Sequence, residues 1–300
     1  MLGSAIGALS DRMDSRFVTA YWVPAFVFVL GALCAFGVMR GPGQIDSWIS
    51  DLDSVEQTLG VVIIVLLVST LAFILRALTR PITEACAGLA IPAPVAAWSK
   101  RGQLRAKRRA AQLLASSTHL KSPDVESPVA ALLQNRFPEN DADLQPTLFG
   151  NLIASASAHP RIAYSMEGLL WWSRLSPLLP QSFQDTLAGA QAPMMALFNL
   201  SIVFLALAVL NVLLGALTSS WLTAIVFAVV SLVLARLSYR AAVSQAAEVS
   251  SMLRVAFDLY RYDILDQLGR PHPETIADER ALWTSITREV LGLEKLPPAS

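Results

Sequence analysis

Four stretches of this 300-residue chain are apolar and free of charged residues, and they limit what the chain can fold into. They cover residues 17–39, 59–75, 197–217 and 221–235. The first has 23 residues, and as a helix it is about 34 Å long, enough to cross the roughly 30 Å hydrocarbon core of a bilayer. It also exceeds the apolar stretch of about 7–15 residues in a secretory signal. We therefore expect four transmembrane helices.

The composition agrees with this expectation. Hydrophobic residues make up 54% of the chain, charged residues only 15%, and the mean hydropathy is +0.51. Soluble domains carry roughly 25% charge, so much of this surface must face lipid. Outside the four runs, the apolar pattern is helical and broken by prolines, without strand-like alternation. The predicted fold class is an all-α, polytopic membrane protein with four transmembrane helices and a cytoplasmic helical module.

Positive charge sets the predicted orientation. Twelve Lys or Arg residues lie in 76–191 and eight follow residue 235, whereas the loop 40–58 has only Arg40. The same loop carries the acidic residues Asp46, Asp51, Asp53 and Glu56. We expect both termini and the central segment in the cytoplasm, and the acidic loop outside the plasma membrane. The use of nineteen arginines against four lysines suggests a GC-rich bacterial origin.

Four segments follow from this topology. Residues 1–80 hold an amino-terminal arm, the first two spans and the outer acidic loop. Residues 81–191 form a cytoplasmic helical insert, residues 192–236 a hairpin of spans three and four joined at 218–220, and residues 237–300 the cytoplasmic carboxyl-terminal helices.

Helix boundaries can be predicted from proline, glycine and capping residues. Residues 221–268 contain neither proline nor glycine, which predicts one helix about 72 Å long that stops before Gly269. Thr275 and Asp278 predict the start of a last helix over 275–291. Within the insert we expect a basic helix over 96–115, loops over 119–128 and 137–146, and short helices over 146–157 and 160–175.

Small and polar residues in the third and fourth runs recur at helical spacing. They are Ser201, Ala208, Asn211 and Gly215 in the third run, and Ala224, Ala228, Ser231 and Ala235 in the fourth. Small residues at this spacing let helix backbones approach closely, and asparagine can hydrogen-bond across the contact. Helix packing within or between subunits is the favoured interpretation. Lining of a narrow pore is the alternative.

A cluster of cations follows the second span. It consists of Lys100, Arg101, Arg105, Lys107, Arg108 and Arg109. Cations close to a membrane surface attract anionic inner-leaflet lipid at about 1 kcal/mol each. Plain positive-inside topology explains the cluster equally well. Nucleic acid is not expected as a partner, because the chain has no net charge and lacks interleaved aromatic residues.

Aromatic residues near the predicted span ends are candidate interfacial anchors. They are Tyr21, Trp22, Trp98, Trp171 and Trp172. For the tandem Trp171–Trp172, burial in a helical cytoplasmic core is an equally good explanation.

Signatures of enzymatic chemistry are not found in the sequence. The three histidines, His119, His159 and His272, are not at metal-ligand spacing from one another or from cysteine. No phosphate-binding glycine loop occurs, and the span interiors carry no charge of the kind that ion-coupled carriers use. We expect no catalytic residue, cofactor or metal, and no bridge between Cys34 and Cys86.

Two functions remain after these exclusions. The first is a non-enzymatic membrane scaffold or anchor that self-associates and presents its cytoplasmic helices to a protein partner. The second is a homo-oligomeric ion channel with the third or fourth span lining the pore. The order of two spans, a long insert, two spans and a tail resembles bestrophin-type chloride channels in arrangement, without a shared motif.

Overall fold

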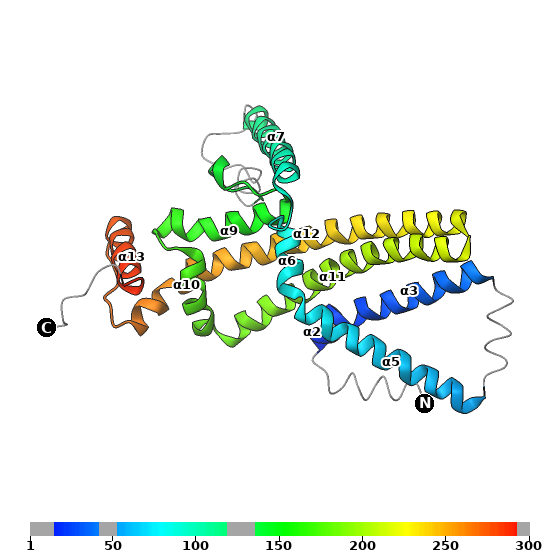
Figure 1. Ribbon diagram of the computed structural model, residues 1–300. Helices are drawn as coiled ribbons and strands as arrows, with labels where there is room; N and C mark the ends of the chain where they lie inside the picture. Colours follow the sequence, from blue (N-terminus) through cyan, green and yellow to red (C-terminus); the bar gives the residue numbers. More distant parts are fainter. Residues whose placement is uncertain (1–14, 42–52, 119–135, 293–300) are drawn as a thin grey trace. The chain divides into compact units, whose positions relative to one another are not determined.

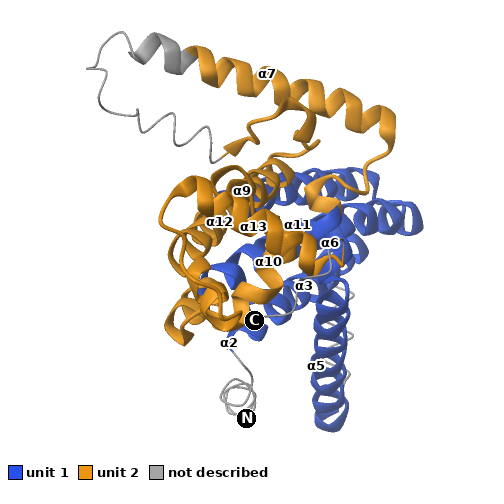
Figure 2. Ribbon diagram, turned by 90° about the vertical axis from the view of Figure 1, so that its left-hand side faces the viewer, with its two compact units in different colours: residues 1–84, 189–245 blue, residues 85–188, 246–300 orange. Residues whose placement is uncertain are grey.

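A computed structural model describes residues 15–41, 53–118 and 136–292 of the chain (Figure 1). All regular elements within these ranges are helices, which confirms the all-helical part of the predicted fold class. Figure 2 shows that the chain divides into two compact units. Unit 1 comprises Met1–Glu84 and Gly189–Gln245, and unit 2 comprises Ala85–Ala188 and Ala246–Ser300.

Four helices in the described ranges are long and apolar enough to cross a membrane. They are Ser15–Arg40, Ser54–Ala77 (α5), Gln181–Thr218 (α11) and Trp221–Gln267 (α12). The first comprises α2 (Ser15–Phe17), a π-helical turn η1 (Val18–Trp22) and α3 (Val23–Arg40). Each helix contains one of the four predicted apolar runs, so their number and positions are confirmed.

The ends of these helices follow local chemistry. At the start of α5, the Asp53 carboxylate accepts a hydrogen bond from the Ser54 amide at 2.6 Å, and Glu56 accepts one from the Asp53 amide at 3.0 Å. This capping box satisfies amides that a helix start otherwise leaves without a partner. The turn between α11 and α12 contains Ser219 with a φ of 55°, which confirms the predicted hairpin.

The long helix α12 agrees closely with its prediction. It has 47 residues and ends one residue before the predicted boundary. Gly269 follows with a φ of 63°, a left-handed conformation that favours glycine and stops the helix. Residues of α12 up to Gln245 belong to unit 1 and later ones to unit 2.

In unit 1, small and branched side chains form the core. One cluster joins α3, α5 and α11 and contains Ala25, Val29, Val68, Ala72, Leu75, Val203 and Leu207. A smaller one consists of Ala35, Met39 and Ala224. Because alanine and glycine have little or no side chain, the helix backbones can approach closely.

The outward-facing side chains of unit 1 are also apolar. Over residues 54–67 of α5, every side chain is exposed or half-buried, including Val55 at 70% and Leu66 at 61% exposed. Leu217 and Leu222 at the α11–α12 turn are 82% and 80% exposed. Monomeric soluble proteins rarely expose large contiguous apolar patches.

Unit 2 contains α7 (Ala93–Thr118), a 3₁₀ turn η2 (Asp141–Asp143), α9 (Leu148–Tyr164), α10 (Gly168–Leu175), a second 3₁₀ turn η3 (Ser176–Leu178), the last part of α12, and α13 (Ile276–Val290). The short helix α6 (Thr79–Ala87) begins in unit 1, and its last three residues belong to unit 2. Trp171 and Trp283 are fully buried in the core of unit 2 and meet edge to face, with ring centroids 5.1 Å apart. The Thr275 hydroxyl accepts a hydrogen bond from the Asp278 amide at 3.2 Å, which confirms the predicted cap of α13.

The prediction of a helix boundary before Pro160 is wrong. Helix α9 continues through Pro160 and ends at Tyr164, followed by Ser165 with a φ of 63°. Proline removes only one backbone donor, and Ala156 and Ala158 are buried in the turn before it. We attribute the continued helix to this packing, because tertiary burial outweighs local preference. The predicted helix over 160–175 is therefore the end of α9 followed by α10.

The other helix and loop predictions in the insert have mixed outcomes. The basic helix is longer than predicted, since α7 starts at Ala93 and ends at Thr118. Residues 137–146 form a loop as predicted, apart from η2. The predicted loop 119–128, and Asp46 and Asp51 of the acidic loop, lie outside the described residues.

Candidate functional site

The two stripes of small and polar residues meet each other in unit 1, within a single chain. Asn211 donates a hydrogen bond to the Ser231 hydroxyl at 3.4 Å, and the Ser201 hydroxyl donates to the Ala235 carbonyl at 3.0 Å. A Cβ atom on Gly215 would overlap that of Ala224. Ala208, Asn211, Gly215, Ala224, Ala228, Ser231 and Ala235 are buried, and Ser201 is half-buried. These contacts form a tight seam between α11 and α12.

A second polar contact in unit 1 was not predicted. The Asn199 side chain is buried and donates a hydrogen bond to the Ala20 carbonyl at 2.7 Å. Ala20 lies in the π-helical turn η1, where the backbone departs from the α-helical pattern. The signal available in the sequence was a lone asparagine at the start of an apolar run. Its partner could not be identified, because a π-helical turn has no sequence signature.

The candidate aromatic anchors lie in different surroundings. Tyr21 is half-buried and accepts a hydrogen bond from Thr79 at 3.2 Å, and Trp22 stacks on Phe26 with ring centroids 5.6 Å apart. Trp98 on α7 is 75% exposed. Trp171 is fully buried and Trp172 partly buried in unit 2. Of the two explanations considered for Trp171, the structure shows burial in the helical core.

The six clustered cations divide between two faces of α7. Lys107 points into unit 2, where its ammonium donates to Asp141 at 2.6 Å and to the Glu139 carbonyl at 2.8 Å. The bond from Lys107 is the main reason why the pKa of Asp141 is lowered. Lys100, Arg101, Arg105, Arg108 and Arg109 are exposed. We call Trp98, Arg101, Arg105, Arg108 and Arg109 the arginine face of α7.

A cavity of about 490 Å³ lies in unit 2. Its polar lining is Lys107, Glu139, Ser155, His159 and Arg254, and its apolar lining is Ala111, Phe137, Pro138, Ala158, Ile162 and Ala163. Arg254 donates to the Ser155 hydroxyl at 2.7 Å, and burial lowers the pKa of its guanidinium. Among the described residues, no group of three side chains is placed to hold a metal ion.

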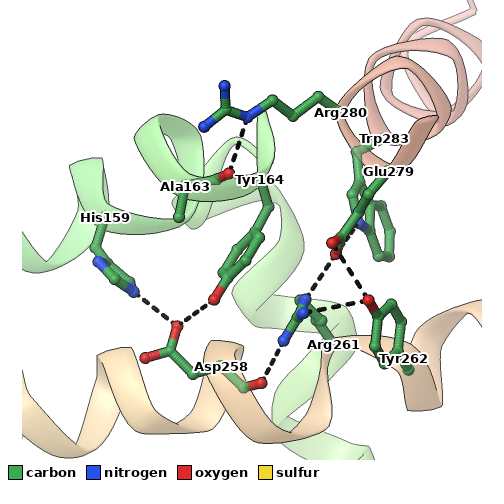
Figure 3. A network of polar contacts seen from close by, with 9 residues as sticks. All are labelled: His159, Ala163, Tyr164, Asp258, Arg261, Tyr262, Glu279, Arg280 and Trp283. Carbon is green, nitrogen blue, oxygen red and sulfur yellow. Dashed lines mark hydrogen bonds and ion pairs between the residues drawn. The ribbon is translucent and has the colours of Figure 1, made fainter. Parts of the chain in front are cut away.

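A polar network that includes the cavity residue His159 joins α9 to α12 (Figure 3). The Asp258 carboxylate accepts a hydrogen bond from the Tyr164 hydroxyl at 2.8 Å and lies 2.7 Å from Nε2 of His159. Burial, followed by the bond to Asp258, raises the pKa of Tyr164 to about 12. His159 therefore has a structural partner as well as a place in the cavity wall.

The network continues to α13 through a buried ion pair (Figure 3). Nε of Arg261 donates to Glu279 at 2.6 Å, and the Arg261 guanidinium lies between the rings of Tyr164 and Tyr262, 4.2 and 4.4 Å from their centroids. Glu279 is 3% exposed. Trp283 donates to the same carboxylate at 3.4 Å. An aromatic pair around a desolvated guanidinium stabilises it through cation–π attraction.

These contacts hold three helices of unit 2 together. Arg280 of α13 also donates to the carbonyls of Ala163 and Ile162 at the end of α9. The remaining described histidine, His272, lies 2.8 Å from Asp266.

Of the two cysteines, Cys34 is exposed and Cys86 is buried, and burial raises the pKa of Cys86 to about 11.

Comparisons with protein-family models, curated proteins and solved structures found no match to this chain.

Proposed function

We propose that this protein is a non-enzymatic integral membrane anchor, with unit 1 in the bilayer and unit 2 presented to a partner in the cytoplasm. The observation that carries the proposal is the apolar outer surface of unit 1, which is exposed along all four long helices. Exposing such a surface to water costs free energy, whereas contact with the acyl chains of a bilayer does not.

The polar groups of the spans support an anchor more than a pore. The Ser201 hydroxyl and the Asn211 amide nitrogen hydrogen-bond across the α11–α12 seam. A channel lined by these helices would have to turn the same groups toward water. The exposed start of α5 offers a surface on which lipid or a second copy can pack, so self-association remains part of the proposal.

Orientation is the first test of the proposal. In a chain with Cys34→Ser and Cys86→Ser, a single cysteine replaces Asp46 or Arg105. A membrane-impermeant maleimide is applied to intact cells and to inside-out vesicles. We expect residue 46 to react only in cells and residue 105 only in vesicles. Labelling of both residues from the same side would refute the topology, and with it the anchor.

A second test separates the anchor from the channel. The reconstituted protein is examined for current across planar bilayers, and its subunit number is measured in nanodiscs. An anchor gives no current at any subunit number. Current that Asn211→Leu alters while assembly is unchanged would establish the channel instead.

A further inference from the structure

We infer that the arginine face of α7 binds the headgroups of anionic lipids and lies at the membrane surface. This inference rests on the proposed function, because it requires the bilayer that holds unit 1. The proposed partner is an anionic lipid surface. The evidence is the way in which the structure divides α7 into a docked side and an open side.

The docked side consists of residues spaced four apart. The Ser99 hydroxyl donates to the Pro146 carbonyl at 2.5 Å, the Gln103 side chain accepts from Asn151 at 3.4 Å, and Lys107 pairs with Asp141. Residues four apart share one face of a helix. These bonds hold α7 against the rest of unit 2 by this face, so the opposite face remains open.

The open side carries a concentrated positive charge. Arg101, Arg105, Arg108 and Arg109 are exposed, and none of them makes an ion pair with a residue in the part of the chain that the structure describes. The 26-residue sequence of α7 contains no Asp or Glu. Guanidinium groups form paired hydrogen bonds with phosphate, which makes the phosphate of a lipid headgroup a matching ligand.

Apolar side chains beside these arginines indicate that the partner is a membrane surface and not a nucleic acid. Trp98 is 75% exposed and Val95 is 52% exposed, both in the first turns of α7. A helix with exposed tryptophan and arginine is typical of the interface between headgroups and acyl chains. Nucleic-acid binding would explain the arginines but not the exposed apolar pair.

The connection to α5 is short enough to keep α7 near the bilayer. Only residues 78–92 separate the end of α5 from the start of α7, and α6 takes up nine of them. The connection therefore extends at most about 35–40 Å. Tethering at this distance raises the local concentration of α7 at the lipid surface.

A fluorescent probe at Gly102, next to Arg101 in the sequence, tests the inference. Gly102 is exposed and a Cβ atom there meets nothing within 4 Å, so Gly102→Cys can carry an environment-sensitive dye in the full chain with Cys34→Ser and Cys86→Ser. The labelled protein is placed in nanodiscs of phosphatidylcholine, or of phosphatidylcholine and phosphatidylglycerol in equal parts. We expect a blue-shifted emission, and quenching by headgroup-linked nitroxide, only in the anionic nanodiscs.

Charge variants complete the test. Arg105→Gln should lower the ratio of surface-bound to detached α7 about fivefold, since each cation near an anionic surface contributes about that factor. Lys100→Gln is the matched control, because Lys100 is exposed on α7 but outside the arginine face, and it should have a smaller effect. Replacing all four arginines of the face by Gln should abolish the lipid dependence, with helical content checked by circular dichroism.

Two results would show that the arginine face does not bind anionic lipid. Equal emission in both nanodiscs would overturn the inference, and so would a response to a short DNA duplex in neutral nanodiscs that exceeds the response to anionic lipid. If the labelling of residues 46 and 105 still reports opposite sides, the anchor stands and only the lipid contact fails.

Discussion

At the scale of single residues, the space around a glycine determines whether a larger side chain there destabilises the protein. Gly215 faces Ala224 across the α11–α12 seam, whereas a Cβ on Gly60 of α5 would meet nothing within 4 Å. Both lie inside helices, so the same substitution has the same intrinsic helix preference at either position.

We expect Gly215→Ala to destabilise the protein by about 1–3 kcal/mol, because the added methyl group forces the seam apart. Gly60→Ala should leave stability unchanged or raise it slightly. Thermal unfolding of both variants in one detergent measures the difference. Equal unfolding temperatures for the two variants would mean that α11 and α12 lie farther apart at Gly215 than the structure shows.

Tyr164 gives unit 2 a predicted sensitivity to alkaline pH. Its pKa is about 12 in the folded state, against an ordinary value of 10.0. The unfolded chain therefore loses this proton first as pH rises from about 10 to 12, and stability falls over that interval. Tyr164→Phe should unfold with a shallower dependence on pH between 10 and 12. Identical slopes for Tyr164→Phe and the unchanged chain would contradict this assignment.

At the residue scale, spacing within one helix carries part of the information about packing. The stripe ending at Gly215 was identified from helical spacing, and its residues do lie together. The bond from Asn199 to Ala20 joins residues 179 positions apart and depends on a π-helical turn. Spacing within one helix cannot reveal such a partner.

At the scale of elements, α13 is attached to unit 2 by one buried face. Trp283 and Ile286 are buried in the core beside Trp171, and Glu279 on the same helix is the partner of Arg261. Ile276 of the first turn is 67% exposed.

We expect Trp283→Ala to cost about 3–5 kcal/mol, as large-to-small changes in a core do, and to abolish the near-ultraviolet circular dichroism of the tryptophan pair. Ile276→Ala, on the same helix, should cost less than about 1 kcal/mol. Denaturant unfolding monitored by tryptophan fluorescence compares them. A small loss for Trp283→Ala would show that α13 is not part of the core.

Helix ends were predictable where one residue determines the backbone. Gly269 and Thr275 have local geometry that stops or starts a helix, and both boundaries agree with the sequence. Pro160 misled the prediction, because its local effect is outweighed by the burial of the preceding turn. Gly168 of α10 lies close to Ser157 and Pro160, and a local pattern does not include such a contact between helices.

At the scale of the whole molecule, the position of a side chain along α12 determines which environment it meets. Val229 lies in the apolar run and Val255 in unit 2, 53% and 39% exposed. Under the proposed function, the first faces acyl chains and the second faces water.

We expect Val229→Arg to disfavour membrane insertion by about 2.5–3.5 kcal/mol, the cost of arginine at the centre of a transmembrane helix. Val255→Arg should insert like the unchanged chain. The fraction of chains in which the α11–α12 hairpin is protected from protease in inside-out membrane vesicles measures insertion in both variants. Equal fractions would contradict a bilayer around this part of α12.

Hydropathy predicted the four long helices because lipid imposes a length and a composition on any helix that crosses it. The arrangement of unit 2 was not predictable in the same way. Its core contains residues of α10, α12 and α13, and Trp171 of α10 contacts Trp283 of α13. Nothing in a single sequence pairs those two tryptophans.

The bond between Asn199 and the Ala20 carbonyl has a consequence for biogenesis. A ribosome makes about 5–20 residues per second, so the 179 residues from Tyr21 to Asn199 take roughly 10–35 s to synthesise. During that interval the carbonyl of Ala20, in the π-helical turn, has no Asn199 side chain to bind. The helix Ser15–Arg40 is therefore made well before the partner of its Ala20 carbonyl.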